Sequence, residues 1–301
     1  MKGGMFEESP RVLLAGCGKV GARLGERLVA AGAQVVALRR EVAALPPSLS
    51  PLAVDLLALP QRALPPVDAM VITLTPDLPS APGGPEGYLV ALCNLAAALP
   101  SIPQRVVLVS STRVFEGRPG ERPITEADEP APASARAETL LAGERLAAEL
   151  FDAHVVRPAG IYGSGRERLL RIVLAGTPVD HAQRTNRIHE TDLVRTLEAM
   201  LQAAPPPRLV HAVDAAPAPL GEVVGFIARR LGVAVPPQLE AGAAGESRES
   251  VAGERAGRRV AGTVLSGALL RTLLPTLRYP SFEDGYGELI ALRERAGGHP
   301  S

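Results

Sequence analysis

The feature that most constrains the fold is the segment 11–40, in which the hydrophobic pattern changes period twice. RVLLAG is a short apolar run of strand length, and KVGARLGERLVAA then carries apolar residues at helical spacing. Gly32 ends the helical pattern, and QVVALRR forms a second apolar run. This order predicts a β-α-β unit.

Three glycines lie where the first strand gives way to the helix. Gly16, Gly18 and Gly21 have G-x-G-x-x-G spacing. In such a loop the first glycine permits a tight turn, the second lets a pyrophosphate approach the backbone, and the third allows close helix–strand packing. Free N–H groups at the start of the helix favour the phosphate charge. We therefore predict a dinucleotide-binding loop, against the alternative of a purely structural glycine turn. The loop also contributes the residues between these glycines: Cys17, Lys19 and Val20.

Apolar strands and helical segments alternate along the rest of the chain. Strand-like runs lie at 52–56, 69–75, 105–110, 154–158 and 208–213, and helical patterns at 88–99, 135–150, 167–175 and 191–203. Such alternation favours a parallel sheet covered on both faces. The predicted fold class is α/β, a doubly wound parallel sheet of the Rossmann type with a smaller C-terminal substrate lobe.

The C-terminal part has a different texture. A helical pattern begins at Leu220, the stretch 241–258 is small, polar and glycine-rich, and one or two closing helices are expected after it. We assign 11–160 plus 187–213 to the dinucleotide-binding domain and 161–186 plus 214–301 to the substrate lobe.

Charge and cysteine content narrow the classes of partner. The 32 Lys and Arg residues balance 32 Asp and Glu residues, so we expect no nucleic acid and no membrane partner. The two cysteines, Cys17 and Cys93, are too few for a disulfide framework and lack metal-ligand spacing. We therefore expect no metal and a cytoplasmic, reducing environment.

The end of the second strand bears on the choice of cofactor. An acidic residue there would accept hydrogen bonds from the adenosine ribose and disfavour a 2′-phosphate. This chain has Arg39 and Arg40, with Glu41 one position later. Because an arginine fork pairs well with a phosphate, we expect NADP in preference to NAD. The alternative is that the arginines are solvated and that Glu41 turns inward.

Later segments follow the glycine loop in a familiar order: VVLVSSTRVFEG at 106–117, VVRPAGIYGSGR at 155–166, NRIHETDLVRTLEAML at 186–201 and TLRYPSFEDGYGELI near the C-terminus. With them, the chain resembles the extended short-chain dehydrogenases/reductases, the NAD(P)-dependent nucleotide-sugar epimerase/dehydratase group. It looks closest to an atypical branch, because GCGKVG has two-spaced rather than three-spaced glycines. The resemblance covers about 11–290.

The resemblance implies roles for several residues. Ser111 occupies the position of the family's Ser or Thr that hydrogen-bonds the reacting oxygen, and Thr112 is the adjacent alternative. Asp55 and Leu56 resemble the pair that contacts the adenine, and Thr73 is included among the cofactor contacts.

The family's Tyr-x-x-x-Lys pair is where this chain departs. Aligning GERLAAE with the family's usual SKLAAE places Arg145 at the lysine and Leu141 at the tyrosine. Arg145 can still hydrogen-bond a ribose, but Leu141 cannot transfer a proton. No tyrosine lies between Tyr88 and Tyr162, so a shift in register does not restore the motif.

Other side chains are weighed as substitutes. Tyr162 is the candidate catalytic tyrosine, with packing or substrate contact as the alternative. The remaining candidates, each with a packing, capping or surface alternative, are Tyr88, Glu138, Glu144, His181 and His189. Cations that could shape the active site or contact a diphosphate are Arg157, Arg166, Arg258 and Arg259.

Two functions remain open from the sequence. The first is an oxidoreductase or epimerase that acts on a small-molecule substrate, such as a nucleotide sugar or another carbonyl or hydroxyl compound. The second is a catalytically silent NAD(P)-binding sensor or regulatory protein. A homodimer is kept as a candidate assembly.

Overall fold

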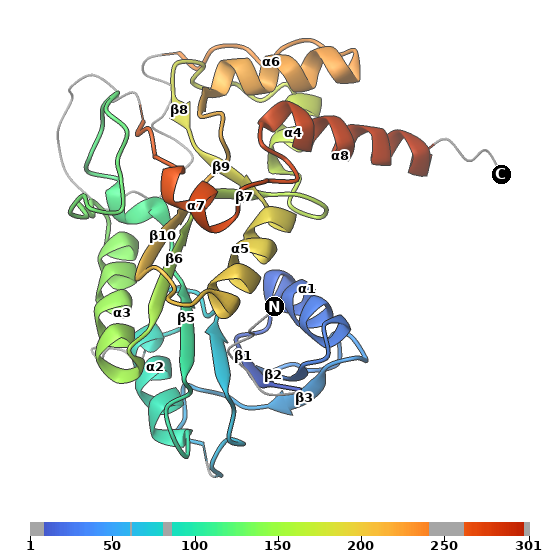
Figure 1. The fold of residues 1–301 in the computed structure, drawn as a ribbon. Coiled ribbons are helices and arrows are strands. Elements are labelled where there is room, and N and C mark those ends of the chain that lie inside the picture. Colours follow the sequence, from blue (N-terminus) through green and yellow to red (C-terminus); the bar gives the residue numbers. More distant parts are fainter. Residues whose placement is uncertain (1–8, 61, 81–85, 241–261, 298–301) are drawn as a thin grey trace.

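A sheet of seven parallel strands forms the centre of the structure, a computed structural model that describes residues 9–60, 62–80, 86–240 and 262–297 (Figure 1). The strand order is β10-β6-β5-β4-β1-β2-β3, and every neighbouring pair is parallel. The chain leaves β1 on one side for β2 and β3 and returns on the other side for β4. This topology confirms the predicted doubly wound sheet. The bounds of its strands are β1 Arg11–Ala15, β2 Gln34–Arg39, β3 Ser50–Ala53, β4 Ala69–Ile72, β5 Arg105–Val109, β6 His154–Pro158 and β10 Leu209–Ala212.

Helices cover both faces of this sheet (Figure 1). Helices α1 (Lys19–Ala30) and α5 (Glu190–Gln202) share one core with strand residues such as Leu14, and the short α7 (Ala268–Leu273) adds to it. Helices α2 (Gly87–Ala98) and α3 (Ala135–Phe151) share the other core with Leu13. Successive strand residues thus point into opposite cores, and both faces of the sheet are buried, as parallel sheets require.

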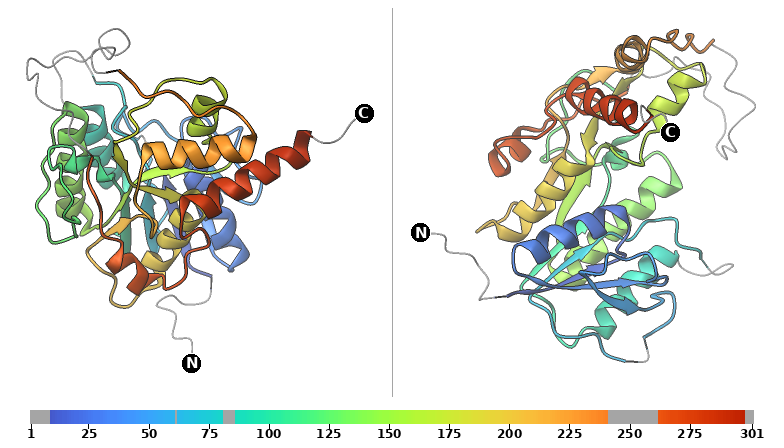
Figure 2. Two further views of the ribbon diagram at one scale, coloured as in Figure 1. Left: turned by 90° about the horizontal axis from the view of Figure 1, so that it is seen from above. Right: turned by 90° about the vertical axis from the view of Figure 1, so that its right-hand side faces the viewer.

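A second, smaller core lies outside the central sheet. It is formed by α4 (Arg168–Leu174), α6 (Leu220–Leu231) and α8 (Phe282–Gly297), which lie together at one end of the molecule (Figures 1 and 2). The two short sheets pair β7 (Gly160–Tyr162) with β9 (Arg187–His189), and β8 (Arg184–Thr185) with β11 (Ala218–Pro219). The predicted loop 241–258 lies outside the described residues. The division into a cofactor domain and a substrate lobe stays a prediction.

One strand begins and ends earlier than its apolar pattern predicts. The apolar run predicts a strand at 52–56, whereas β3 covers Ser50–Ala53. Strand β3 is the edge of the sheet and is largely exposed, so hydrophobicity is a poor guide to its bounds; Pro51 is tolerated there because an edge strand has a free side. The chain turns at Asp55, whose carboxylate accepts a hydrogen bond from the N–H of Leu57 at 3.0 Å. Asp55 and Leu56 therefore follow the strand.

No helix in the described part of the chain is both long and apolar enough to cross a bilayer.

The contact between α2 and α3 generates a stability prediction. Replacing a helical glycine with alanine normally favours the helix by about 0.8–1.0 kcal/mol. At Gly143, however, a Cβ atom would lie 2.2 Å from Cε1 of the fully buried Tyr88 ring. Overpacking of this kind costs about 1–3 kcal/mol, so Gly143→Ala should lower the free energy of unfolding in urea titrations. In a Tyr88→Leu background the same change should be neutral or stabilising; a gain in the wild-type background would contradict this account.

Candidate functional site

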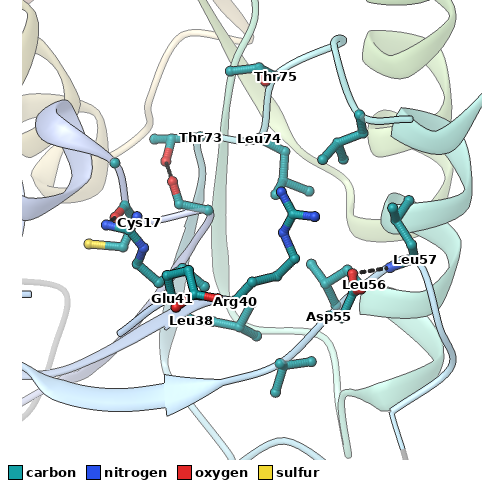
Figure 3. A pocket seen from close by; sticks show the side chains of 15 residues that line it. Cys17, Leu38, Arg40, Glu41, Asp55, Leu56, Leu57, Thr73, Leu74 and Thr75 are labelled. Atoms are coloured by element: carbon teal, nitrogen blue, oxygen red, sulfur yellow. Dashed lines mark hydrogen bonds between the residues drawn. The ribbon is translucent and has the colours of Figure 1, made fainter. Parts of the chain in front are cut away.

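A pocket of about 320 Å³ lies at the carboxyl ends of β1, β2 and β4 (Figure 3). This is the place where the strand order reverses, and ligands of open α/β sheets bind at such a switch point. Eight of the predicted cofactor residues line the pocket: Gly16, Cys17, Gly18, Arg39, Arg40, Asp55, Leu56 and Thr73. The remaining lining residues include Glu41, Leu74 and Thr75.

The glycine loop has the geometry that a pyrophosphate requires. Gly16 has φ +83°, and a Cβ there would lie 2.8 Å from the side chain and 2.9 Å from the backbone N of Leu74. The space above Gly18 is open, since a Cβ placed there would find the Gly16 carbonyl oxygen as its nearest neighbour, at 3.9 Å. Gly18 is the N-cap residue of α1, and no side chain caps that helix start. The free N–H groups therefore face open space beside the pocket and fit a phosphate.

Cys17 and Thr73 hold this loop in place. The Thr73 hydroxyl donates to the Gly16 carbonyl at 2.6 Å. At Gly21 a Cβ would contact Cys17 Sγ at 3.4 Å and Thr73 Oγ1 at 3.5 Å, so α1 packs closely on the strands. The Cys17 thiol is buried, and burial raises its pKa to about 11. Cys17 is thus a packing residue of the loop rather than a reactive thiol.

Two loop residues point away from the pocket. Val20 is buried in the core between α1 and the sheet. Lys19 donates from Nζ to the Gly165 carbonyl at 3.1 Å, across 146 positions of sequence. The glycine loop is thereby linked to the turn that follows β7, which also carries Arg166.

The two arginines at the end of β2, Arg39 and Arg40, line the pocket. Arg39 donates from Nη1 to the Cys17 carbonyl at 3.3 Å. Figure 3 shows the Arg40 side chain extending across the pocket, with Glu41 beside its base. Two cations and one carboxylate therefore lie at the end of the second strand.

The candidate catalytic hydroxyls lie beyond β5 and do not line this pocket. Ser111 precedes a 3₁₀ turn at Thr112–Phe115, and its Oγ accepts a hydrogen bond from the N–H of Arg113 at 3.2 Å. The Thr112 hydroxyl donates to the Pro158 carbonyl at 3.3 Å. On α3, Arg145 is exposed and Leu141 packs against the cluster that contains Phe115.

The two tyrosines considered as substitutes are both buried. Tyr162 stacks on Tyr286 at 4.6 Å and donates its hydroxyl to the Ser281 carbonyl at 3.3 Å. Burial raises the pKa of this phenol far above its usual value. Tyr88 is fully buried between α2 and α3. Tyr162 belongs to the core of α4, α6 and α8, and this placement favours its packing alternative.

The two candidate histidines also have structural partners. His189 accepts a hydrogen bond at Nδ1 from the N–H of Thr191 and so caps α5; burial lowers its pKa to about 4. His181 lies in the C-terminal part, with Nε2 2.8 Å from the Pro236 carbonyl. The fully buried Asp192 accepts hydrogen bonds from two N–H groups, those of Arg278 and Tyr279.

Glu144 has an environment that the sequence did not indicate. It is buried and accepts hydrogen bonds from the Arg157 guanidinium and from Ser110, whereas Glu138 on the same helix is exposed. An apolar pattern of period 3.6 would have placed Glu144 on the inward face of α3, and that was the available signal. Arg258 and Arg259 lie outside the described residues. In the described part of the chain, no three His, Cys, Asp or Glu side chains are grouped to hold a metal ion.

Comparisons with known proteins agree with this geometry. Residues 89–185 match the family described as the RmlD substrate binding domain. A structure from Methylobacillus flagellatus, assigned to the NAD-dependent epimerases/dehydratases, shares 27% sequence identity over 95% of this chain and 99% of its own, with a TM-score of 0.71. No curated protein sequence matches the chain.

Two more distant structures share the fold and hold ligands. MoeE5, in complex with UDP-glucose and NAD, is 23% identical over 96% of this chain and 100% of its own, with a TM-score of 0.73. A UDP-glucuronic acid 4-epimerase from Bacillus cereus, in complex with UDP-glucuronic acid and NAD, is 16% identical over 95% and 99%, with a TM-score of 0.68.

The environments of the two cysteines lead to a prediction of selective labelling. At about pH 8, a thiol with a pKa of about 11 is ionised in roughly one molecule in a thousand, and Cys17 is also buried. Cys93 is exposed on α2. Iodoacetamide should therefore modify Cys93 and spare Cys17 in the native protein, as measured by peptide mass spectrometry. In urea both should react; equal native labelling would show that the loop packing is wrong.

Proposed function

We propose that the chain is an NAD(P)-dependent oxidoreductase or epimerase, because it resembles the extended short-chain dehydrogenases/reductases in its fold and in several ordered sequence segments. Its substrate would be a nucleotide sugar or another small carbonyl or hydroxyl compound. The observation that carries the proposal is the pocket at the switch point, with an open glycine loop and an uncapped helix start. The M. flagellatus structure and the ligands of MoeE5 support it.

The residues around the pocket divide the work of holding the cofactor. The N–H groups in the first turn of α1 would hold the pyrophosphate. The N–H groups of Gly16 and Gly18 already donate to the Leu38 and Gly16 carbonyls, so these two glycines would serve by leaving room for the phosphates. Asp55 and Leu56 would contact the adenosine, beside Thr73. When bound, the nicotinamide ring supplies or accepts a hydride.

The polar groups beyond β5 would serve the substrate. Ser111 Oγ already accepts a hydrogen bond from Arg113, so its own proton is free to be donated to a substrate oxygen. The proton of Thr112 is committed to the Pro158 carbonyl, and Ser111 is therefore the better candidate of the two. Arg145 is exposed and can hydrogen-bond a ribose hydroxyl, but a guanidinium does not give up its proton at neutral pH. We assign the proton exchange to solvent water, because Leu141 offers none.

The arginines after β2 support a preference for NADP. A 2′-phosphate would place its charge near Arg39 and Arg40, which together outweigh the single carboxylate of Glu41. MoeE5 and the B. cereus epimerase hold NAD, so this preference is a proposal about the present chain. We also propose that 161–186 plus 214–301 contacts the substrate, that the protein works in the cytoplasm, and that a homodimer is its candidate assembly.

Cofactor choice is tested at Arg39. Arg39→Asp should weaken NADPH binding about 10- to 100-fold, because charge-assisted hydrogen bonds contribute roughly 1.5–3 kcal/mol, and should weaken NADH binding much less. Dissociation constants from nicotinamide fluorescence measure both. The exposed Arg62 lies outside the pocket, so Arg62→Asp is a control for the change in net charge. Equal losses for the two cofactors would refute the 2′-phosphate assignment.

Catalysis is tested by a substrate screen. The protein should convert at least one UDP- or dTDP-linked sugar, followed by nicotinamide absorbance and by chromatography of the sugar products. On that substrate, Ser111→Ala should lower kcat by about 10²-fold or more, since it removes a donor to the reacting oxygen. The exposed Ser101→Ala is the matched control. Tight cofactor binding without turnover on any sugar or carbonyl compound would favour the silent sensor instead.

A further inference from the structure

Three polar side chains lie near the carboxyl ends of the neighbouring strands β5, β6 and β10. This is the end of the sheet that also bears the candidate catalytic hydroxyls. Arg157 on β6 is in register with His211 on β10. On the other side of β6, Ser110 follows β5 directly, and its N–H donates to the Val156 carbonyl at 2.8 Å. All three polar side chains are buried. Buried polar side chains of this kind require hydrogen-bond partners.

Glu144 on α3 supplies the partner for two of these three side chains. Its Oε1 accepts hydrogen bonds from Ser110 Oγ at 2.5 Å and from Arg157 Nε at 2.9 Å. Its Oε2 accepts from Arg157 Nη2 at 2.6 Å. Glu144 and Arg157 are only 6% and 4% exposed, so the pair is a two-pronged, desolvated ion pair.

A buried ion pair of this kind is an inefficient way to stabilise a fold. Removing two charges from water costs several kcal/mol per ion, and well-packed apolar residues often do as well or better. Apolar side chains already pack the inward face of α3, at Leu140, Ala147 and Phe151, so an ion pair is not needed to bury this face. What the ion pair adds is direction: two parallel hydrogen bonds fix the helix relative to β6 at one height and one rotation.

The elements fixed in this way surround the candidate catalytic residues. Glu144 directly precedes Arg145, and Ser110 directly precedes Ser111. The Arg157 guanidinium also lies 5.1 Å from the ring centroid of Phe115, at the end of the turn that Ser111 begins. Helix α3, the end of β5 and this turn therefore all meet at the Glu144–Arg157 pair.

The same elements lie on the side of the sheet where the second half of a dinucleotide must go. The pocket occupies the β1, β2 and β4 side, and the glycine loop follows β1. In the strand order, β5 and β6 lie beyond β4, away from β2 and β3. A cofactor with its adenosine in the pocket and its pyrophosphate on the loop must extend its nicotinamide half toward β5 and β6.

We propose that Glu144 is a positioning residue: clamped by Arg157, it sets Ser111 and Arg145 around the nicotinamide half of the cofactor site. The proposal rests on the proposed function, since it presupposes dinucleotide binding. This positioning role stands in place of the alternative in which Glu144 acts as a proton donor, because both carboxylate oxygens already accept hydrogen bonds. The positioning concerns only the nicotinamide half, and the adenosine pocket is independent of it.

The test compares a whole cofactor with its adenosine half. The cofactor is whichever of NADPH and NADH binds the wild-type chain more tightly, and the fragment is 2′-phospho-ADP-ribose or ADP-ribose, respectively. Glu144→Gln keeps the volume and removes the charge. It should weaken binding of the whole cofactor about tenfold, equivalent to roughly 1.4 kcal/mol, and change fragment binding by less than about twofold. Calorimetry measures both dissociation constants well below the melting temperature of each variant.

Two further variants make the outcome decisive. Ser110→Ala removes one hydrogen bond and leaves the ion pair intact, so it should fold and show the same selective loss at about threefold, even if Glu144→Gln does not fold. Glu149→Gln changes an exposed carboxylate on the same helix and should alter neither affinity. Equal losses of cofactor and fragment, or no loss in Ser110→Ala and Glu144→Gln, would overturn the positioning role. A wild-type chain that binds neither ligand would instead overturn the proposed function.

Discussion

Burial of both faces of the parallel sheet is the constraint on which the rest of the structure depends. Residues such as Leu13 and Leu14 point into opposite cores, and neither face is left for polar chemistry. The polar groups of the candidate site lie instead at the carboxyl ends of the strands, where loops begin. The glycine loop, Arg39, Thr73 and Ser111 all lie there, one after each of four different strands or at its end. The location of the candidate site therefore follows from the architecture of the sheet, whereas its chemistry depends on individual side chains.

The parts of the molecule that could be predicted from the sequence are the local ones. The glycine loop, α1, β2 and the arginines that follow lie within 11–40, and their geometry depends on neighbours in sequence. The long helices and buried strands could be predicted to within a few residues, because a single hydrophobic period extends through each. The bounds of the edge strand β3 could not, because exposure weakens that period.

The parts that could not be predicted depend on contacts between distant segments. Ser110, Glu144 and Arg157 come from two strands and a helix, and no spacing along the chain reveals that they meet. Tyr162 lies within the family-like segment 155–166, yet its ring packs against Tyr286 of the C-terminal helix α8. Lys19 likewise hydrogen-bonds the carbonyl of Gly165, which lies 146 positions later in the sequence. Such contacts are decided by the tertiary packing, which local patterns do not encode.

The division between local and distant contacts also separates binding from chemistry. The proposed adenosine and pyrophosphate half of the site lies at the ends of β1, β2, β3 and β4, and its pocket includes no residue of α3. The proposed nicotinamide half depends on side chains that α3 carries to the end of β5, where the family resemblance places Leu141 at the position of the tyrosine. A chain can therefore keep its affinity for a dinucleotide while its proton chemistry is rebuilt. In the proposed arrangement, the Glu144–Arg157 pair holds α3 against β6, and Ser110 joins the end of β5 to the same carboxylate, without a proton being exchanged.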